Sequence, residues 1–315
     1  MLNVWRLQLL REVQRRGSVR AAAEAMSVTP SAVSQQLAIL EKEAGVELLE
    51  KSGRQIRLTE AGLRLARHTD SITGAIAAAE ADVASLRGSV VGTLRVAAFP
   101  TAARAVMPPV MTALSRIHPD LRVTLRDLEA DDSLTALQMD EIDVAIVDEY
   151  GDGSRVPASS LEVREFMRDP VYLASVPSGG SWKPGGEPKP APLAEFRDAF
   201  WIMDTDNSHL SQVTRRACRA AGFEPHVRSS CRDFGVIIAL VEAGLGVGVL
   251  PGLALLDRPL RADVRPISPP LVRRISSVVR PERRHHPAIV SAIAELERFG
   301  AGYLPPVGGW TDAPA

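Results

Sequence analysis

Apolar positions in the first 58 residues recur at helical spacing in three short segments, and in each segment they fall on one face. Thr29 is a suitable N-cap for the third helix, and Pro30 suits its first turn, where the donor that proline lacks has no helical partner. Residues 48–58 then predict a short two-stranded wing around a turn at Ser52 and Gly53. The apolar positions of the three helices are Leu7, Leu10 and Val13, then Val19, Ala22, Ala23 and Met26, then Val33, Leu37 and Leu40.

A long helical pattern follows from about residue 60 to residue 87, with Thr59 as its N-cap and Gly88 at its end. Its apolar or small positions alternate spacings of four and three, which is the heptad pattern of paired helices. At about 1.5 Å per residue the helix is roughly 40 Å long, so we expect a partner helix to cover this stripe. Packing against the chain's own body domain is the alternative. The stripe consists of Leu65, Thr69, Ile72, Ile76, Ala79, Val83 and Leu86.

From Gly92 to about residue 300 the pattern alternates between strands and helices. This alternation predicts parallel α/β sheets with right-handed crossovers, and two such runs in about 200 residues predict two lobes. Residues 177–192, with five prolines and four glycines, are predicted to form a surface loop, and the tail after Gly300 to be flexible. The predicted strands are 94–99, 121–128, 142–147, 163–167, 171–176, 200–203, 227–231, 247–250 and 274–279, and the predicted helices are 102–118, 133–139, 208–221, 234–243 and 288–299.

Composition narrows the class of protein. The chain has 315 residues, of which 24% are charged and 45% hydrophobic, as expected for two or three folded domains, and this excludes global disorder. Because the sequence has no apolar run of about 18 residues and no signal-peptide pattern at its start, we expect a cytoplasmic protein with no membrane partner. Two cysteines, Cys218 and Cys231, exclude a disulfide framework and a four-cysteine zinc site.

The first three helices and the basic hairpin form the winged helix-turn-helix pattern, in which one helix presents its first turns to the major groove of DNA. With Val33, Leu37 and Leu40 buried, the outward residues of that helix include serines and a glutamine, which hydrogen-bond base edges, while the wing offers cations to phosphates. Residues 1–67 hold 11 Lys and Arg against 7 Asp and Glu, although the whole chain carries a net charge of −1. The alternative is a set of solvated polar positions on a small helical bundle. The outward residues are Ser31, Ser34, Gln35 and Ala38, and the cations are Lys51, Arg54 and Arg57.

The order of residues adds a resemblance. The chain resembles the LysR-type transcriptional regulators, densely over about the first 65 residues and more loosely to about residue 299. The residues that carry it are Leu7-Gln8-Leu9-Leu10, Gly17-Ser18-Val19-Arg20-Ala21-Ala22-Ala23-Glu24, Val28-Thr29-Pro30-Ser31-Ala32-Val33-Ser34-Gln35-Gln36-Leu37, Leu40-Glu41, Gly45-Val46-Glu47-Leu48-Leu49-Glu50-Lys51 and Leu58-Thr59-Glu60-Ala61-Gly62.

The resemblance implies a fold, a function and partners. The implied fold is α/β with an all-α-type winged helix-turn-helix head (1–58), a long linker or dimerisation helix (59–88), a two-lobed, periplasmic-binding-protein-like effector domain (92–300) and a flexible tail (301–315). The implied function is promoter binding and a change in transcription when a small-molecule effector binds between the lobes. The implied partners are double-stranded promoter DNA, the effector, further copies of the chain in a homodimer or homotetramer, and RNA polymerase.

Transferred by position, the resemblance assigns DNA contacts to the start of the third helix and to the wing. The family commonly has Arg where this chain has Gln35, and a basic residue where it has Ile39, so we expect weaker phosphate attraction and a flatter salt dependence. The operator sequence is therefore not transferable from relatives. The assigned residues are Thr29, Pro30, Ser31, Ser34, Gln35, Lys51, Arg54 and Arg57.

An effector between the lobes is expected where strands end and helices begin, because free N–H groups and the positive helix ends lie there. Three junctions qualify, at residues 99–101, 131–133 and 204–208, and the alternative for Thr101, Asp132 and Ser208 is that they only cap helices. Thr101, residues 205–208, Phe234 and Val249 match ligand-contact positions of the family. The expected effector contacts are Pro100, Thr101, Asp132, Ser133, Thr205, Asn207, Ser208, Phe234 and Val249, and the carboxylates Asp131, Asp132, Asp204 and Asp206 favour a ligand with an amine.

Other motifs do not indicate cofactors or catalysis. The glycines of Gly244-Leu245-Gly246-Val247-Gly248 follow a helix and enter a strand, the reverse of a dinucleotide-binding turn. His285-His286 lacks companions at metal-ligand spacing, and free cytosolic thiols are usually structural. We therefore expect no cofactor, no metal and no enzyme activity. The alternative is an α/β metabolite-binding protein or enzyme with an N-terminal assembly module, which would need convergent catalytic residues that the sequence does not present.

Overall fold

The computed structural model describes residues 1–52, 55–85, 90–151, 161–176, 189–256 and 261–306. Arg54, the end of the linker helix, most of the predicted Pro- and Gly-rich loop and the end of the predicted tail lie outside these ranges. The chain divides into two compact units: the first combines residues 1–90 with 280–290, and the second combines residues 91–279 with 291–315.

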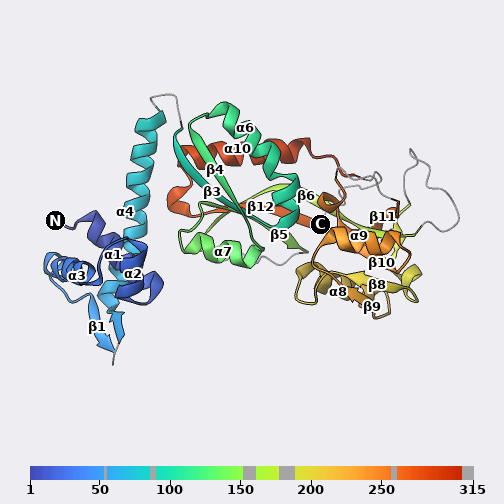
Figure 1. Ribbon diagram of the computed structural model, residues 1–315, viewed down its shortest axis with the longest axis horizontal. Coiled ribbons are helices and arrows are strands. Elements are labelled where there is room, and N and C mark those ends of the chain that lie inside the picture. The colour runs from blue at the N-terminus through green and yellow to red at the C-terminus, as the bar shows by residue number, and fades with distance from the viewer. Residues whose placement is uncertain (53–54, 86–89, 152–160, 177–188, 257–260, 307–315) are drawn as a thin grey trace. The chain divides into compact units, whose positions relative to one another are not determined.

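The first unit begins with three short helices and a hairpin, as the sequence pattern predicts (Figure 1). Asn3, Ser18 and Thr29 each cap the helix that follows, and each accepts a hydrogen bond from a backbone N–H of the first turn. Gly17 and Gly45 end the first and third helices at a φ of 71°, a left-handed conformation that favours glycine. The elements are α1 (Val4–Arg16), α2 (Val19–Ala25), α3 (Pro30–Ala44), β1 (Leu49–Ser52), β2 (Gln55–Leu58) and α4 (Glu60–Ser85).

The predicted apolar faces of these helices meet in one core. Val33, Leu37 and Leu40 of α3 are at most 1% exposed, and they pack with buried leucines of α1. Each fully buried leucine contributes about 1.5–3 kcal/mol relative to an exposed one, so this core fixes the orientation of α3. The opposite face of α3 is left exposed.

The apolar stripe of α4 divides into two halves. Ala66 is buried in the core of the helical head, and Leu65 and Ile72 pack against that core. Farther along the helix, Ile76 is 39% exposed and Val83 is 58% exposed. The first half of the stripe is therefore covered by the head, while apolar positions of the second half face outward.

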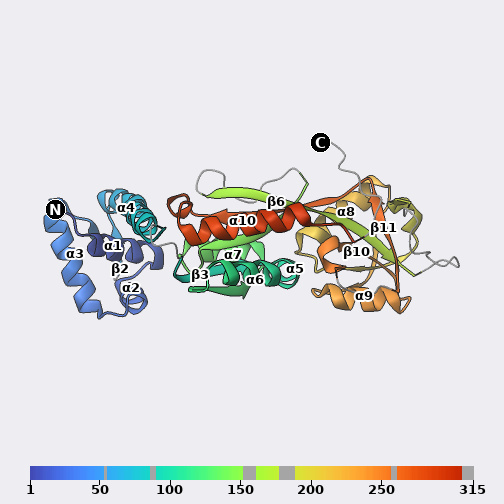
Figure 2. The same ribbon diagram turned by 90° about the horizontal axis from the view of Figure 1, so that it is seen from above.

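The second unit contains two lobes, each built around a sheet (Figure 2). In the first lobe, β4 (Leu121–Asp127), β3 (Gly92–Ala98) and β5 (Val144–Tyr150) are parallel, with the helices α5 (Pro100–Ala105), α6 (Met107–Ile117) and α7 (Ala130–Gln138). In the second lobe, β10 (Val247–Pro251), β8 (Phe200–Met203) and β9 (His226–Ser230) are parallel, with α8 (His209–Ala220) and α9 (Phe234–Glu242). The remaining elements are β7 (Ala191–Pro192), β11 (Asp263–Ser268), α10 (Pro287–Gly302), and the 3-10 helices η1 (Leu193–Phe196), η2 (Gly252–Ala254) and η3 (Pro281–Arg283).

The parallel strands that the alternation predicts are confirmed, and two antiparallel strands complete the sheets. The segments 163–167 and 171–176, predicted as separate strands, form the single strand β6 (Glu162–Ser175). Its first part pairs with β12 (Val272–Val279), and its part after Pro170 pairs with β10 and β11. Pro170 therefore marks the point where the strand passes from one lobe to the other, rather than a strand end.

Three other boundaries differ from the prediction. The predicted helix 102–118 is two helices, α5 and α6, because Pro108 and Pro109 cannot donate helical hydrogen bonds to the preceding turn. Strand β11 was not predicted, since Pro266 interrupts its pattern. Helix α10 continues to Gly302, and the hydroxyl of Tyr303 donates to Asp169 Oδ1 at 2.7 Å, so the start of the predicted tail is held in place.

Candidate functional site

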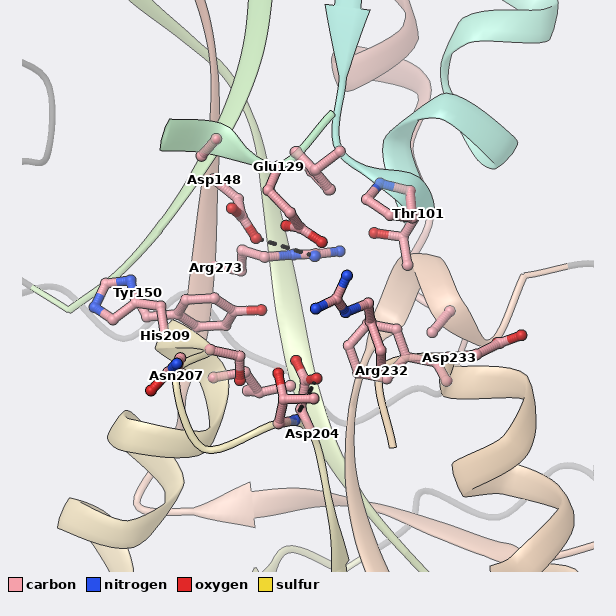
Figure 3. Close-up of a pocket in the computed structure, with 18 of the residues that line it drawn as sticks. Thr101, Glu129, Asp148, Tyr150, Asp204, Asn207, His209, Arg232, Asp233 and Arg273 are labelled. Atoms are coloured by element: carbon pink, nitrogen blue, oxygen red, sulfur yellow. Dashed lines mark hydrogen bonds and ion pairs between the residues drawn. The ribbon is translucent and has the colours of Figure 1, made fainter. Parts of the chain in front are cut away.

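A pocket of about 840 Å³ lies between the two lobes of the second unit (Figure 3). Its volume falls within the usual range of about 300–1,000 Å³ for small-molecule sites. The predicted residues Pro100, Thr101, Asp132, Thr205, Asn207, Ser208 and Phe234 all line it.

Thr101 contributes an unsatisfied polar group to the wall of the first lobe. It is the second residue of α5, whose N-cap is Phe99, so the interpretation of Thr101 as a cap is wrong. The residue is only 6% exposed, and its Oγ1 has no hydrogen-bond partner among the described residues. In Figure 3 this hydroxyl points toward the middle of the pocket. A buried hydroxyl without a partner is energetically unfavourable, so Thr101 is ready to bond a ligand or water.

The facing wall comes from the loop between β8 and α8. Ser208 Oγ accepts from the N–H of Ser211 at 3.0 Å, so Ser208 is the N-cap of α8 and also lines the pocket. Asp204 Oδ1 accepts from the N–H of Thr205 at 2.7 Å. These bonds hold the loop in place, and the carboxylate of Asp204 faces the cavity in Figure 3.

Three sequence interpretations on α7 and β10 are corrected. Asp132 lines the pocket but caps nothing, because α7 begins at Ala130 with Glu129 as its N-cap. Ser133 is fully buried, donates to the carbonyl of Leu128 at 3.2 Å and does not line the pocket. Val249 is 5% exposed within the core of the second lobe and is also not part of the lining. Both side chains point into the protein rather than toward the cavity.

Arg273 is a pocket residue that the sequence interpretation missed. Its guanidinium donates to Asp169 Oδ2 at 2.6 and 3.1 Å and to Asp148 Oδ2 at 3.3 Å. The same guanidinium lies over the ring of Phe99, 4.9 Å from its centroid. Asp169 also accepts from the N–H of Leu253, so the network joins both crossover strands to η2. The only sequence signal was an arginine directly before a predicted apolar strand.

The pocket contains other polar groups that sequence reasoning missed. Tyr150, at the end of β5, packs edge-on against His209 of α8 with centroids 5.4 Å apart. Burial raises the pKa of Tyr150 well above its ordinary value. Arg104 of α5 donates to the carbonyl of Leu253 at 2.6 Å. Both contacts join the two lobes. The rule that ligands bind beyond the carboxyl ends of parallel strands would have found Tyr150, had the strand end been placed correctly.

Two carboxyl groups that line the pocket have raised pKa values. Partial burial is the main cause for Glu129, and the negative charges of Asp148 and Asp204 raise its pKa further. Burial also raises the pKa of Asp204, against the lowering effect of its hydrogen bond from Thr205. Arg232 lowers both pKa values. Glu129 and Asp204 therefore hold a proton more readily than exposed carboxyl groups do.

The predicted nucleic-acid contacts of α3 share one exposed surface. Thr29, Pro30, Ser31, Ser34 and Gln35 are all exposed, and Thr29 Oγ1 accepts from the N–H of Ala32 at 3.2 Å. In the wing, Arg57 on β2 is exposed. Lys51 lies on β1, but its side chain and all of Arg54 are outside what the structure describes.

Glu41 positions the start of the wing. One oxygen of its carboxylate accepts from the N–H groups of Leu48 and Leu49, at 2.8 and 3.0 Å. Gln36 is tied to α1 through Arg6 Nε at 2.9 Å. These bonds fix α3 and the hairpin in one rigid unit, which suits recognition of a fixed target.

Across the described ranges of the chain, no helix is long and apolar enough to cross a membrane. In the same ranges, no group of three His, Cys, Asp or Glu side chains has the arrangement of a metal site. Cys218 is buried, and burial raises the pKa of its thiol to about 12.

A helix-turn-helix head with a wing, joined in one chain to a two-lobed α/β domain with a polar pocket, defines a ligand-responsive regulator of transcription. Residues 5–63 match the bacterial regulatory helix-turn-helix proteins of the lysR family, and residues 87–300 match the LysR substrate binding domain. The chain therefore belongs to the LysR family of DNA-binding transcriptional regulators, for which effector control is typical.

Individual relatives extend over nearly the whole chain. The chain is 29% identical over 287 residues to the transcriptional dual regulator GltC of Bacillus subtilis (strain 168), covering 90% of this chain and 92% of GltC. A full-length OxyR variant from Pseudomonas aeruginosa has a similar fold, with a TM-score of 0.63, 19% identity and coverage of 94% and 98%. Full-length CbnR, solved in complex with its target DNA, has a TM-score of 0.51, 24% identity and coverage of 94% and 99%.

Proposed function

We propose that a small molecule bound in the pocket between the lobes controls how this regulator binds or activates its promoter, and that the chain is not an enzyme. The observation that carries the proposal is the pocket itself, in which the buried hydroxyl of Thr101 lacks a partner among the described residues. Closing two lobes on a ligand shifts the population of domain arrangements, because the ligand prefers the arrangement in which both walls touch it.

The way the polar groups of the pocket are used favours binding over catalysis. Ser208 and Asp233 accept from backbone N–H groups as helix caps. Arg273 is held by two carboxylates, and Arg104 by a backbone carbonyl. These bonds hold the walls in place, and none of them activates a nucleophile.

For the head, we infer that α3 enters the major groove of promoter DNA. Ser31, Ser34 and Gln35 would contact base edges. Thr29 and Pro30 would place the start of the helix next to the DNA backbone. The wing cations Lys51, Arg54 and Arg57 would contact phosphates. Support comes from the exposure of the α3 surface, from the buried apolar face behind it, and from family membership.

The second half of α4 supports self-association. Ile76 and Val83 are seven residues apart, one heptad, and both are exposed in the single chain. A second copy of the helix would cover them, giving a homodimer that a further interface extends to a tetramer. Where the outcome is activation, RNA polymerase is the additional partner. Replacing both residues by Glu should yield monomers in light scattering, whereas an unchanged mass would contradict this interface.

The pocket is tested with Thr101→Trp in the full-length protein. A metabolite library is screened for compounds that raise the melting temperature, since a ligand of the native state stabilises it. The indole of the variant should fill the cavity. Compounds that raise the melting temperature of the wild type should therefore no longer raise that of Thr101→Trp, while DNA binding remains. Thr112→Trp is the matched control, because Thr112 is exposed on α6 and does not line the pocket. An unchanged response in Thr101→Trp would contradict the proposed site.

A further inference from the structure

The charge of the pocket indicates the chemistry of its ligand. Six carboxylates and three arginines are among the lining residues. The carboxylates come from both lobes: Glu129, Asp131, Asp132 and Asp148 from the first, and Asp204 and Asp233 from the second.

The arginines do not offset this charge equally. Arg273 is bound by Asp169 and Asp148, so its charge is already matched by carboxylates. Arg104 donates to the backbone carbonyl of Leu253. Arg232 is the lining arginine whose guanidinium makes no hydrogen bond or ion pair with the residues that the structure describes. An anionic ligand would therefore find one available cation and several carboxylates that repel it.

Glu129 and Asp204 are the carboxylates best placed for a ligand. Glu129 lies directly before α7, its carboxylate accepts no hydrogen bond within the described residues, and it points into the cavity in Figure 3. Asp204 points into the same space from the opposite lobe. Two like charges on facing walls oppose closure of the lobes, and a cation between them would remove that repulsion.

Thr101 provides an independent indication of a ligand. Its Oγ1, on a residue that is 6% exposed, points into the pocket and has no partner within the described residues. Like a carboxylate oxygen, a hydroxyl oxygen can accept a hydrogen bond from an ammonium group, but the hydroxyl carries no negative charge.

We propose that the pocket takes a small aliphatic amine or amino acid, with its ammonium group bound by Glu129 and Asp204 from opposite lobes and by Thr101 Oγ1. An amino acid would place its carboxylate on Arg232. This inference rests on the proposed effector control and specifies its ligand. The ammonium would draw the two lobes together, which gives the ligand a direct effect on the arrangement of the domain.

The test uses the full-length protein in an amine-free buffer. Thermal shifts are measured with putrescine, agmatine, L-lysine and L-arginine, and with 1,4-butanediol, glutarate and adipate as comparison compounds without an amine. We expect at least one amine to raise the melting temperature and the comparison compounds to leave it unchanged. Its affinity, measured by calorimetry, should fall at least about tenfold in Glu129→Gln and in Asp204→Asn, since each removes a charged hydrogen-bond acceptor.

Asp206→Asn is the matched control. Asp206 lies on the same loop as Asp204, pairs with Arg215 at 2.8 Å and does not line the pocket, so amine affinity should stay within about twofold of wild type. No stabilisation by any of the four amines would overturn the inference, and so would an amine affinity in Glu129→Gln and Asp204→Asn that is unchanged from wild type. If glutarate or adipate stabilised the wild type but not Thr101→Trp, the proposal that the ligand is an amine would be wrong. The proposal that an effector binds in this pocket would still hold.

Discussion

Replacing Asp169 by Asn should strongly destabilise the two-lobed domain. Asp169 is fully buried and accepts from Arg273 Nε and Nη2, from the N–H of Leu253 and from the hydroxyl of Tyr303. Asparagine has the same shape, so the substitution removes the charge without creating a cavity. The buried guanidinium is then left with Asp148 alone, at 3.3 Å.

The magnitude follows from the burial of both partners. Breaking a buried ion pair by removing one charge costs about 3–5 kcal/mol, because the other charge stays buried without compensation. Domains of about 200 residues lose about 2–4 °C of melting temperature per kcal/mol, so we expect a decrease of about 6–20 °C. Against a typical total stability of about 5–15 kcal/mol, this is a large fraction.

The assays are thermal and urea denaturation of the full-length protein, each monitored by circular dichroism, with Asp206→Asn as the control. The side chain of Asp206 is 74% exposed in its pair with Arg215, and exposed pairs contribute at most about 1 kcal/mol. A loss below about 1 kcal/mol in Asp169→Asn, equal to that of the control, would refute the argument that the network is held together by buried charge.

Three further predictions concern other parts of the chain. A Cβ at Gly62 would lie 2.2 Å from the backbone carbonyl oxygen of Leu48, so Gly62→Ala should distort the start of the wing and lower both the melting temperature of the head and DNA affinity. Because burial raises the pKa of Cys218 to about 12, its thiol should react with Ellman's reagent at pH 8 only after denaturation. Rapid modification of both free thiols, Cys218 and the partly buried Cys231, in the native protein would contradict this. Because partial burial raises the pKa of Glu129, the native state binds its proton more tightly than the unfolded chain, whose carboxyl pKa is about 4.3. The stability that Glu129 contributes below that pH should therefore be lost as the pH rises through its native pKa. The melting temperature of the unliganded wild type should then fall relative to that of Glu129→Gln. A difference in melting temperature between the two proteins that stays constant from pH 4 to 7 would contradict the raised pKa of Glu129.

The helical head was predictable because its signals are local. The spacing of Val33, Leu37 and Leu40 reports one buried face, and Thr29 followed by Pro30 fixes where α3 begins. The junctions at Thr101 and Ser208 were predictable for the same reason, since a strand end followed by a helix start is visible in a short window.

The rest of the pocket depends on pairings over long distances in the sequence. Arg273 reaches the cavity because β12 lies between β5 and β6, more than 100 residues away in the chain, and no local pattern specifies that register. Ser133 was assigned to the pocket because the predicted helix began three residues late. Ser133 was therefore taken as the first residue of the helix, whereas α7 begins at Ala130 and Ser133 is buried within it.

The most direct test of the account is a fluorescence-anisotropy titration of the full-length protein with the duplex upstream of its own gene, against a random duplex at moderate salt. Wild type should prefer the upstream duplex, and Gln35→Ala should lose about 1–3 kcal/mol of that preference while keeping its affinity for the random duplex. Equal affinity of the wild type for both duplexes would contradict the assignment of α3 as the helix that recognises DNA.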